Sequence, residues 1–413
     1  MNQPDHDELG TQLTRTLTEH ADVMAGSSFG LADVQGRARS IRRRRTATAV
    51  AGVAAAVAVV IPTVTAASHS GGNREPGPAT HSPTPTPTAT AVDRRAPLDV
   101  RDLALGKPPG VDYLTRTTVH LSDGGTGEVR TSDPVNRFTV LSDGTAVYLT
   151  RDGRGQAHVE VTDSGGMQHG PYQAEDGLAM DPSGAAATWV SPDGQVHAWV
   201  ATDTTPTTIA TPVPGVGPQV DGMVGTCSVG APCRVLVRTT DEQTGEVTDQ
   251  IASSDGTVEV ADPSGRFVTV ADLASSGLLT GYTRIGGSDS CSAVAPPTGP
   301  VAWETCDHSL LAFSPGATSV SADVVFRSGL GTSVFAAYDA ANGDLLFEHR
   351  STAKTQAFVL GSVWEDDTHL LATTFQGGMW YVVRFDVNGS MELAVPATKG
   401  DDVQAPFVLA GQR

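Results

Sequence analysis

The stretch DPSGAAATWVSPDGQVHAWVA, residues 181–201, contains a pattern that recurs along most of the chain. It consists of a turn, an apolar run at 186–190, a second turn and a second run at 195–201. Pro, Asp, Ser and Gly favour tight turns, and the runs between them contain β-branched and aromatic residues. The stretch therefore predicts two short strands joined by a tight turn.

Similar turns, Asp or Ser followed closely by Gly, precede other strand pairs. Their spacing of ~40–50 residues, with four short strands per unit, is the signature of a β-propeller blade. Together with strands expected within 111–121, these units predict seven blades, with six as the alternative. A strand at 407–410 is expected to pair with the first one and close the ring, which removes exposed sheet edges. The units are marked by Gly144, Gly184, Gly222, Gly265, Gly316 and, in a degenerate form, Asp367.

The whole region 98–413 follows a strand pattern. Apolar and polar residues alternate in 157–162, 233–238 and 379–387, as expected of strands with one well-buried face. No amphipathic helix longer than about ten residues occurs there. The sequence predicts an all-β domain.

Two of the turns also resemble a known family. Residues 181–184 followed by Ala-Ala-Ala-Thr-Trp-Val, and 262–265 followed by Arg-Phe-Val, are similar to the blade core of TolB-type, WD40-like bacterial propellers. The resemblance covers about residues 135–390, and the Trp-Asp blade ending of eukaryotic WD40 repeats is missing. The resemblance implies the β-propeller fold, but it assigns no functional residue in this chain.

An uncharged stretch near the N-terminus predicts a membrane anchor. As a helix, residues 46–67 would span ~33 Å at ~1.5 Å per residue, enough for a hydrocarbon core of ~30 Å. Their unbroken apolar part, 49–61, is short, so a cleaved signal peptide with a site at 65–67 is the alternative. The region that precedes this stretch is too long for an ordinary signal peptide, which favours the anchor. The anchor would lie in contact with membrane lipid.

Positive charge gives the anchor a direction. Arg37 and Arg39 precede a run of four arginines, and the next charges after the uncharged stretch are Arg74 and Glu75. Because Lys and Arg mark the cytoplasmic flank, we expect a single-pass protein of the cell membrane with a cytoplasmic N-terminus and an extracytoplasmic C-terminal domain. The membrane-flanking run is Arg42, Arg43, Arg44 and Arg45.

Two further segments flank the anchor. Residues 68–97 form a Pro/Thr-rich disordered linker, in which 83–88 alternates the two residues and favours an extended stalk. Residues 1–45 form a cytoplasmic tail, partly helical or disordered, with Leu9, Leu13 and Leu17 at helical spacing. The tail lacks the His and Cys pattern of a zinc-bearing anti-sigma domain, which favours a topogenic role.

The chain is acidic, with a formal net charge of −19, and the excess lies after the anchor. Such a domain repels nucleic acid, whose binding depends on phosphate neutralisation. It favours cations or basic partners. The alternative is that the acidity only keeps an exported domain soluble.

Four cysteines lie in the predicted propeller. Their pairing into near neighbours predicts two disulfides, Cys227–Cys233 and Cys291–Cys306, which an oxidising compartment permits. Free thiols are one alternative. A zinc site is the other, although the spacing differs from Cys-x2–4-Cys and no His is placed to complete a site.

The sequence predicts no catalytic, cofactor-binding or metal-binding residue. The nearest approach to a Gly-x-Ser-x-Gly elbow, residues 286–290, lacks the final Gly, and no Walker A, His-Glu-x-x-His or EF-hand motif occurs. Scattered residues could still converge at the channel, namely His158, His197, His308, His349, His369, Asp366 and Asp367. The tryptophans are interpreted as packing between blades or, alternatively, as a sugar-stacking platform: Trp189, Trp199, Trp303, Trp364 and Trp380.

These features favour a membrane-tethered extracytoplasmic β-propeller that acts as a non-enzymatic binding or scaffold module for a protein or a small ligand. Fold alone does not dictate this function. An extracytoplasmic hydrolase or lyase acting on glycans is one alternative, which at least two acids and an aromatic at one channel mouth would favour. A transmembrane sensor that signals through residues 1–45 is the other.

Overall fold

The computed structural model describes residues 94–411 except 132, 211, 229, 287–288 and 325–330. The predicted tail, the predicted anchor and most of the predicted linker therefore lie outside the described residues. Within the described ranges, no helix has the length and apolar character needed to cross a membrane.

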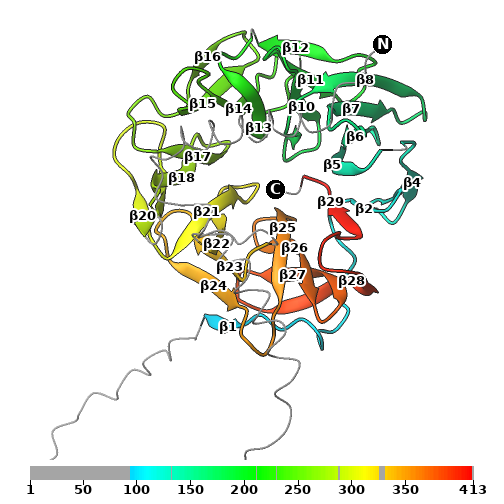
Figure 1. The fold of residues 1–413 in the computed structure, drawn as a ribbon, viewed down its shortest axis with the longest axis vertical. Coiled ribbons are helices and arrows are strands. Elements are labelled where there is room, and N and C mark those ends of the chain that lie inside the picture. The colour runs from blue at the N-terminus through cyan, green and yellow to red at the C-terminus, as the bar shows by residue number, and fades with distance from the viewer. Residues whose placement is uncertain are drawn as a thin grey trace, which may run out of the picture. The chain divides into compact units, whose positions relative to one another are not determined.

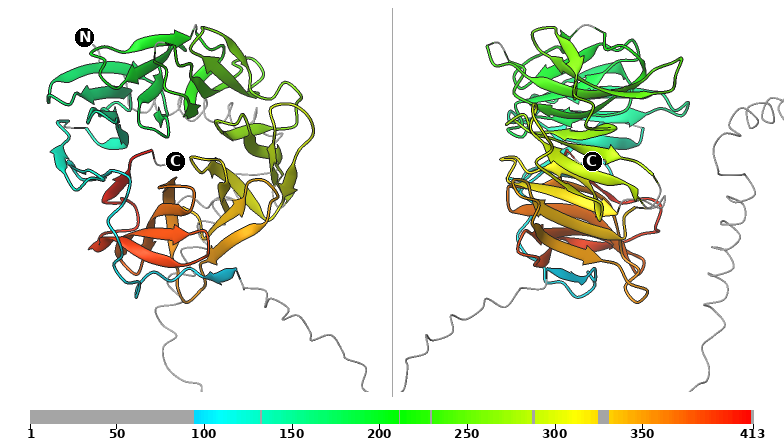
Figure 2. Two further views of the ribbon diagram at one scale, coloured as in Figure 1. Left: turned by 180° about the vertical axis from the view of Figure 1, so that it is seen from behind. Right: turned by 90° about the vertical axis from the view of Figure 1, so that its left-hand side faces the viewer.

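Seven sheets surround a central channel, so the described residues form a seven-bladed β-propeller (Figure 1, Figure 2). This confirms the predicted all-β fold and blade number, and the alternative of six blades is wrong. From the channel outward, blades 1 to 3 are β29 (Phe407–Leu409), β2 (Tyr113–Thr115), β3 (Thr118–His120), β4 (Thr126–Glu128); β5 (Val135–Val140), β6 (Ala146–Arg151), β7 (Ala157–Thr162), β8 (Gln168–Ala174); β9 (Ala179–Met180), β10 (Ala186–Val190), β11 (Val196–Val200), β12 (Thr207–Ala210).

The remaining four blades follow the same order of strands. Blades 4 to 7 are β13 (Val216–Val224), β14 (Arg234–Thr240), β15 (Val247–Ser253), β16 (Val258–Val260); β17 (Thr269–Leu273), β18 (Leu279–Arg284), β19 (Cys291–Ala295), β20 (Trp303–Thr305); β21 (His308–Phe313), β22 (Ser319–Val324), β23 (Val334–Asp339), β24 (Leu345–Arg350); β25 (Phe358–Trp364), β26 (His369–Gln376), β27 (Met379–Asp386), β28 (Met391–Lys399).

The ring is closed by the C-terminal strand, as predicted. β29 pairs antiparallel with β2, so that Leu409 lies opposite Tyr113 and Phe407 opposite Thr115. Blade 1 therefore takes its inner strand from the end of the chain and its other three strands from near the start of the domain (Figure 1). Closure leaves no inner strand without a partner among the described blades.

A strand precedes blade 1 at the end of the predicted linker. β1 (Arg95–Pro97) pairs parallel with β24 and makes blade 6 five-stranded, so the linker prediction extends too far at this end. Leu98 and Val100 then pack among the aromatic rings between blades 6 and 7. We call residues 94–112 the strap, because the segment crosses blade 7 to reach blade 1 (Figure 1). Further along the strap, the N–H of Gly106 donates to the carbonyl of Leu393 in β28 (2.8 Å).

The structure corrects the position within the blade that was predicted for two of the repeated turns. Gly144, Gly184, Gly316 and Asp367 lie in loops between the first and second strands of their blades, whereas Gly222 lies inside β13 and Gly265 precedes β17. Residues 262–265 therefore connect blade 4 to blade 5, and not the first two strands of one blade as their resemblance to a blade core implied. The reason is that the same Asp-capped turn can reverse the chain at either end of a strand.

The blades stack face to face, so strands are buried on both sides. β27 was expected to bury one face, but every residue from Trp380 to Phe385 is buried. Trp189 and Trp199 fill the space between blades 2 and 3, and Trp380 packs against β29. Trp303 contacts Tyr338 of blade 6, and Trp364 lies in the core between blades 6 and 7. Packing between blades, rather than a sugar-stacking platform, is thus the confirmed interpretation.

Both predicted disulfides are present. Cys227–Cys233 closes the loop between β13 and β14, and Cys291–Cys306 ties the start of β19 to the end of β20. Cys233 and Cys291 are buried.

Removing the disulfides should destabilise the propeller unequally. The sequence separations of 15 and 6 residues predict losses of about 3 kcal/mol for Cys291→Ser/Cys306→Ser and about 2 kcal/mol for Cys227→Ser/Cys233→Ser, because a longer loop restricts the unfolded chain more. Denaturant unfolding of each double variant measures both values. Unchanged midpoints in both would contradict this expectation.

Candidate binding site at the channel mouth

A cavity lies where the inner strands of the blades end. Its volume is about 460 Å³, and it is lined by the last residues of these strands and by the loops that follow. The contributing loops include Ser142 and Gly144 of blade 2, Ser183 of blade 3 and Ser275 of blade 5. The repeated turns that predicted the blades therefore also form the mouth of the channel.

About half of the cavity wall is apolar. Leu178, Met223, Leu273 and Phe313 come from four successive blades and are joined by other aliphatic side chains. Trp364 also lines the cavity, and its Nε1 donates to the carbonyl of Ala312 (2.9 Å), which fixes the ring against blade 6. A ligand side chain that enters the mouth would exchange water for apolar surface.

Four acids line the same cavity, and no Lys, Arg or His is among its described lining residues. Asp112 accepts a hydrogen bond from the N–H of Ser122 (2.6 Å), and Asp123 accepts one from Gly125 (2.8 Å). Buried Asp272 accepts one from the N–H of Phe313 (2.8 Å), which links blades 5 and 6. The fourth acid is Glu365.

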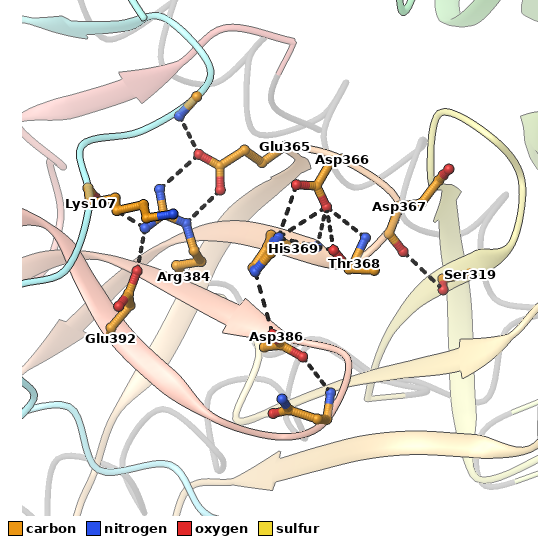
Figure 3. A network of polar contacts seen from close by, with 12 residues as sticks. Lys107, Ser319, Glu365, Asp366, Asp367, Thr368, His369, Arg384, Asp386 and Glu392 are labelled. Atoms are coloured by element: carbon orange, nitrogen blue, oxygen red, sulfur yellow. Dashed lines mark hydrogen bonds and ion pairs between the residues drawn. The ribbon is translucent and has the colours of Figure 1, made fainter.

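Glu365 belongs to a buried ion network that fastens the strap to blade 7 (Figure 3). Arg384 donates from Nε and Nη2 to the two carboxylate oxygens of Glu365 (2.5 and 2.8 Å) and from Nη1 to Glu392. It also donates to the carbonyls of Lys107 (3.0 Å) and Pro108 (2.8 Å) in the strap. The hydrogen bonds with Glu365 raise the pKa of Arg384, which favours the charged guanidinium.

A second polar cluster lies beside this network (Figure 3). The ring of His369 lies between two carboxylates, with Nδ1 2.9 Å from Asp366 and Nε2 3.4 Å from Asp386. Burial opposes ionisation of Asp366, but hydrogen bonds from the Thr368 N–H and the His369 side chain outweigh it and lower the pKa of Asp366 to about 2. Asp367 instead accepts a hydrogen bond from the N–H of Gly316 in blade 6 (2.6 Å).

Acids also occur beyond the cavity, in loops of six of the seven blades on the same face of the ring. In each blade the inner strand runs toward the cavity, and the third strand runs parallel to it, so the loops after both strands lie on the same side. We call these loops the mouth face. Among the described residues, none of these loops contains Lys, Arg or His. Their acids are Asp123, Asp143, Asp163, Asp181, Asp203, Asp255, Asp344, Glu365, Asp366 and Asp367.

Cations are placed differently. The loops on the opposite face contain both signs of charge, with Arg and Lys at Arg116, Arg130, Arg154, Arg266 and Lys354. Near the mouth face, positive residues belong to strands or to the strap: Arg234 begins β14, Arg384 is paired with two glutamates, and Lys107 lies in the strap. The described loops of both faces hold more acids than cations, and the mouth face differs in that its described loops contain no cation.

The structure does not bring the candidate histidines together at the channel. None of them is among the described residues that line the cavity. His158 and His197 lie on third strands, and His349 lies on β24. His308 and His349 are buried, and burial lowers the pKa of both; the carboxylate of Glu348, 3.4 Å from His308, opposes this shift. These residues support the blades rather than form a site.

The lining acids Asp112, Asp123, Asp272 and Glu365 were not predicted as site residues. The signal for Asp123 and Glu365 was present, since both lie in turns. Identifying these two acids as site residues would have required knowing which turns lie on the same face of the ring. Asp112 and Asp272 lie outside the turn motif and gave no such signal.

No family model matches this chain, and no curated protein matches it. Solved structures do. A chain of the mitotic checkpoint complex is 13% identical, with 74% of this chain and 98% of that chain covered and a TM-score of 0.44. The computationally designed Ika8 protein is 13% identical (76% and 92% covered, TM-score 0.43). YCF48, solved with a D1 peptide bound, is 12% identical (71% and 88% covered, TM-score 0.42).

Proposed function

We propose that this protein is a non-enzymatic binding module, tethered to the membrane by residues 46–67, whose propeller lies outside the cell and holds a protein partner at the mouth of its channel. The observation that supports this most is the open cavity, about half of whose wall is apolar and to which each blade contributes residues at one mouth. A concave apolar site with a few converging polar groups is the usual form of a ligand site. The two disulfides fit an oxidising compartment.

The site is suited to binding because its polar groups are already held in place. The acids that line it accept hydrogen bonds from backbone N–H groups, and Glu365 is fixed by Arg384. Preorganisation lowers the entropy cost of binding. The cavity, of about 460 Å³, can admit side chains of a protein segment that lies across the mouth.

Site-specific crosslinking tests this function. A photoreactive amino acid at Ser275, exposed at the mouth, should capture a partner in intact host cells. The same group at Gln243, exposed in the loop between β14 and β15 on the opposite face, is the matched control. We expect a product from position 275 that position 243 does not give. Equal products from both positions, or none from 275, would contradict a binding site at the mouth.

One observation favours a glycan-active enzyme as a second candidate. Acids and an aromatic, Trp364, do occur at one mouth, which is the arrangement expected for that class. However, Trp364 is only 7% exposed, and its ring has little free surface for a sugar to stack on. An enzyme of this kind would release reducing ends from a polysaccharide and lose this turnover in Asp112→Asn or Asp123→Asn. The binding function predicts no turnover.

A further inference from the structure

We infer that the partner held at the mouth is a cationic polypeptide segment, in which an apolar side chain enters the channel and neighbouring Lys or Arg side chains contact the mouth face. The inference rests on the proposed function and specifies the chemistry of the ligand. Two properties of the same surface support it: the apolar half of the cavity wall, and the presence of acids without Lys, Arg or His in the described loops that surround the cavity.

The charge of the mouth face is not explained by turn geometry alone. Several of its aspartates cap their own turns; Asp143, for example, accepts hydrogen bonds from the N–H of Thr145 and of Thr202. Yet Asp152 and Asp241 cap turns in the same way on the opposite face, where Arg and Lys occur in the loops as well. Turn chemistry therefore accounts for the presence of Asp on both faces, but not for the lack of cations in the loops of one.

The distribution of the acids favours a polypeptide over a small cation. Acidic loops belong to blades 1, 2, 3, 4, 6 and 7, and Asp272 supplies a carboxylate from blade 5. A single small cation contacts only one or two neighbouring loops. A segment of chain that crosses the mouth would reach loops of several blades at once and place one side chain in the cavity between them. Complementary charge of this kind steers association and sets the register of a bound segment.

A labelled peptide of alternating Lys and Leu tests the inference on the full-length chain. We expect the peptide to bind, as measured by fluorescence anisotropy, with an affinity that falls as the salt concentration rises. A matched peptide with Glu in place of Lys should not bind. A peptide with Ser in place of Leu should bind more weakly, because it has no side chain for the apolar part of the cavity wall.

Variants locate the binding. Asp112→Asn/Asp123→Asn removes two charges at the mouth but retains the oxygens that accept the turn hydrogen bonds, and should weaken binding about fivefold. Asp241→Asn/Glu242→Gln removes two exposed charges from the opposite face and should leave binding unchanged. Ser275→Trp, which narrows the mouth, should abolish binding, whereas Gln243→Trp on the opposite face should not.

The outcomes separate this inference from the proposed function. Equal weakening by the two double variants would show non-specific attraction to an acidic protein and would overturn the inference. If no Lys-Leu peptide binds but the crosslinker at Ser275 captures a neutral or acidic segment, the inference is wrong and the binding function stands. If position 275 also captures nothing, both are wrong.

Discussion

Deleting residues 407–413 should abolish cooperative folding of the propeller. β29 is the inner strand of blade 1, and its only partner within the sheet is β2. Without it, β2 becomes an exposed edge at the channel, and the core between blades 7 and 1 loses Phe407 and Leu409, both buried. In each of the other blades the inner strand and the next three strands are consecutive in sequence, so none of these strands is available to complete blade 1. Thermal unfolding followed by circular dichroism measures the loss of the cooperative transition.

A point variant gives the same test on a protein that still folds. Leu409→Ala should cost about 2–5 kcal/mol of unfolding free energy, because a fully buried side chain leaves a cavity behind. Val403→Ala, in the exposed loop just before β29, is the matched control and should change stability by less than about 0.5 kcal/mol. If the truncated protein melts like the intact chain, closure by β29 does not stabilise the ring.

Replacing Arg384 with Met should destabilise the propeller by about 3–5 kcal/mol. The guanidinium is buried and pairs with Glu365, so its removal leaves a buried carboxylate without its counter-charge. The strap also loses the donors that hold the carbonyls of Lys107 and Pro108. Arg384→Lys should restore only part of the stability, because an ammonium cannot reproduce the planar contacts of the guanidinium with one carboxylate. Denaturant unfolding gives each value.

A double variant separates lost charge pairing from lost packing. Arg384→Met/Glu365→Gln should be more stable than Arg384→Met alone, since the buried charge is removed together with its partner. Arg101→Met, which breaks the exposed pair with Asp99, should cost no more than about 1 kcal/mol. If Arg384→Met costs no more than Arg101→Met, the network does not hold the strap in place.

The sequence predicted the number of blades because each chain reversal needs turn residues, and these recur in every blade. It could not predict the phase of the repeat, since residues 181–184 and 262–265 have the same turn chemistry but lie at opposite ends of their blades. β1 gave no local signal either: all three of its residues are exposed, and it exists only through pairing with β24.

The candidate site was harder to predict for the same reason. Its acids come from loops far apart in sequence, and their convergence depends on knowing which loops follow an inner or a third strand. The predicted histidines were chosen for their chemistry, but strand position decides what a side chain can reach. His308, for example, is enclosed by Tyr338 and Glu348 within the blades.

A structure of the full-length chain with its captured partner tests the central claim most directly. The account predicts that the partner lies across the channel mouth, with an apolar side chain between Leu273 and Phe313 and Lys or Arg side chains within hydrogen-bonding distance of Asp112 and Asp123. A partner bound to the opposite face, or to the outer edges of the blades, would contradict it.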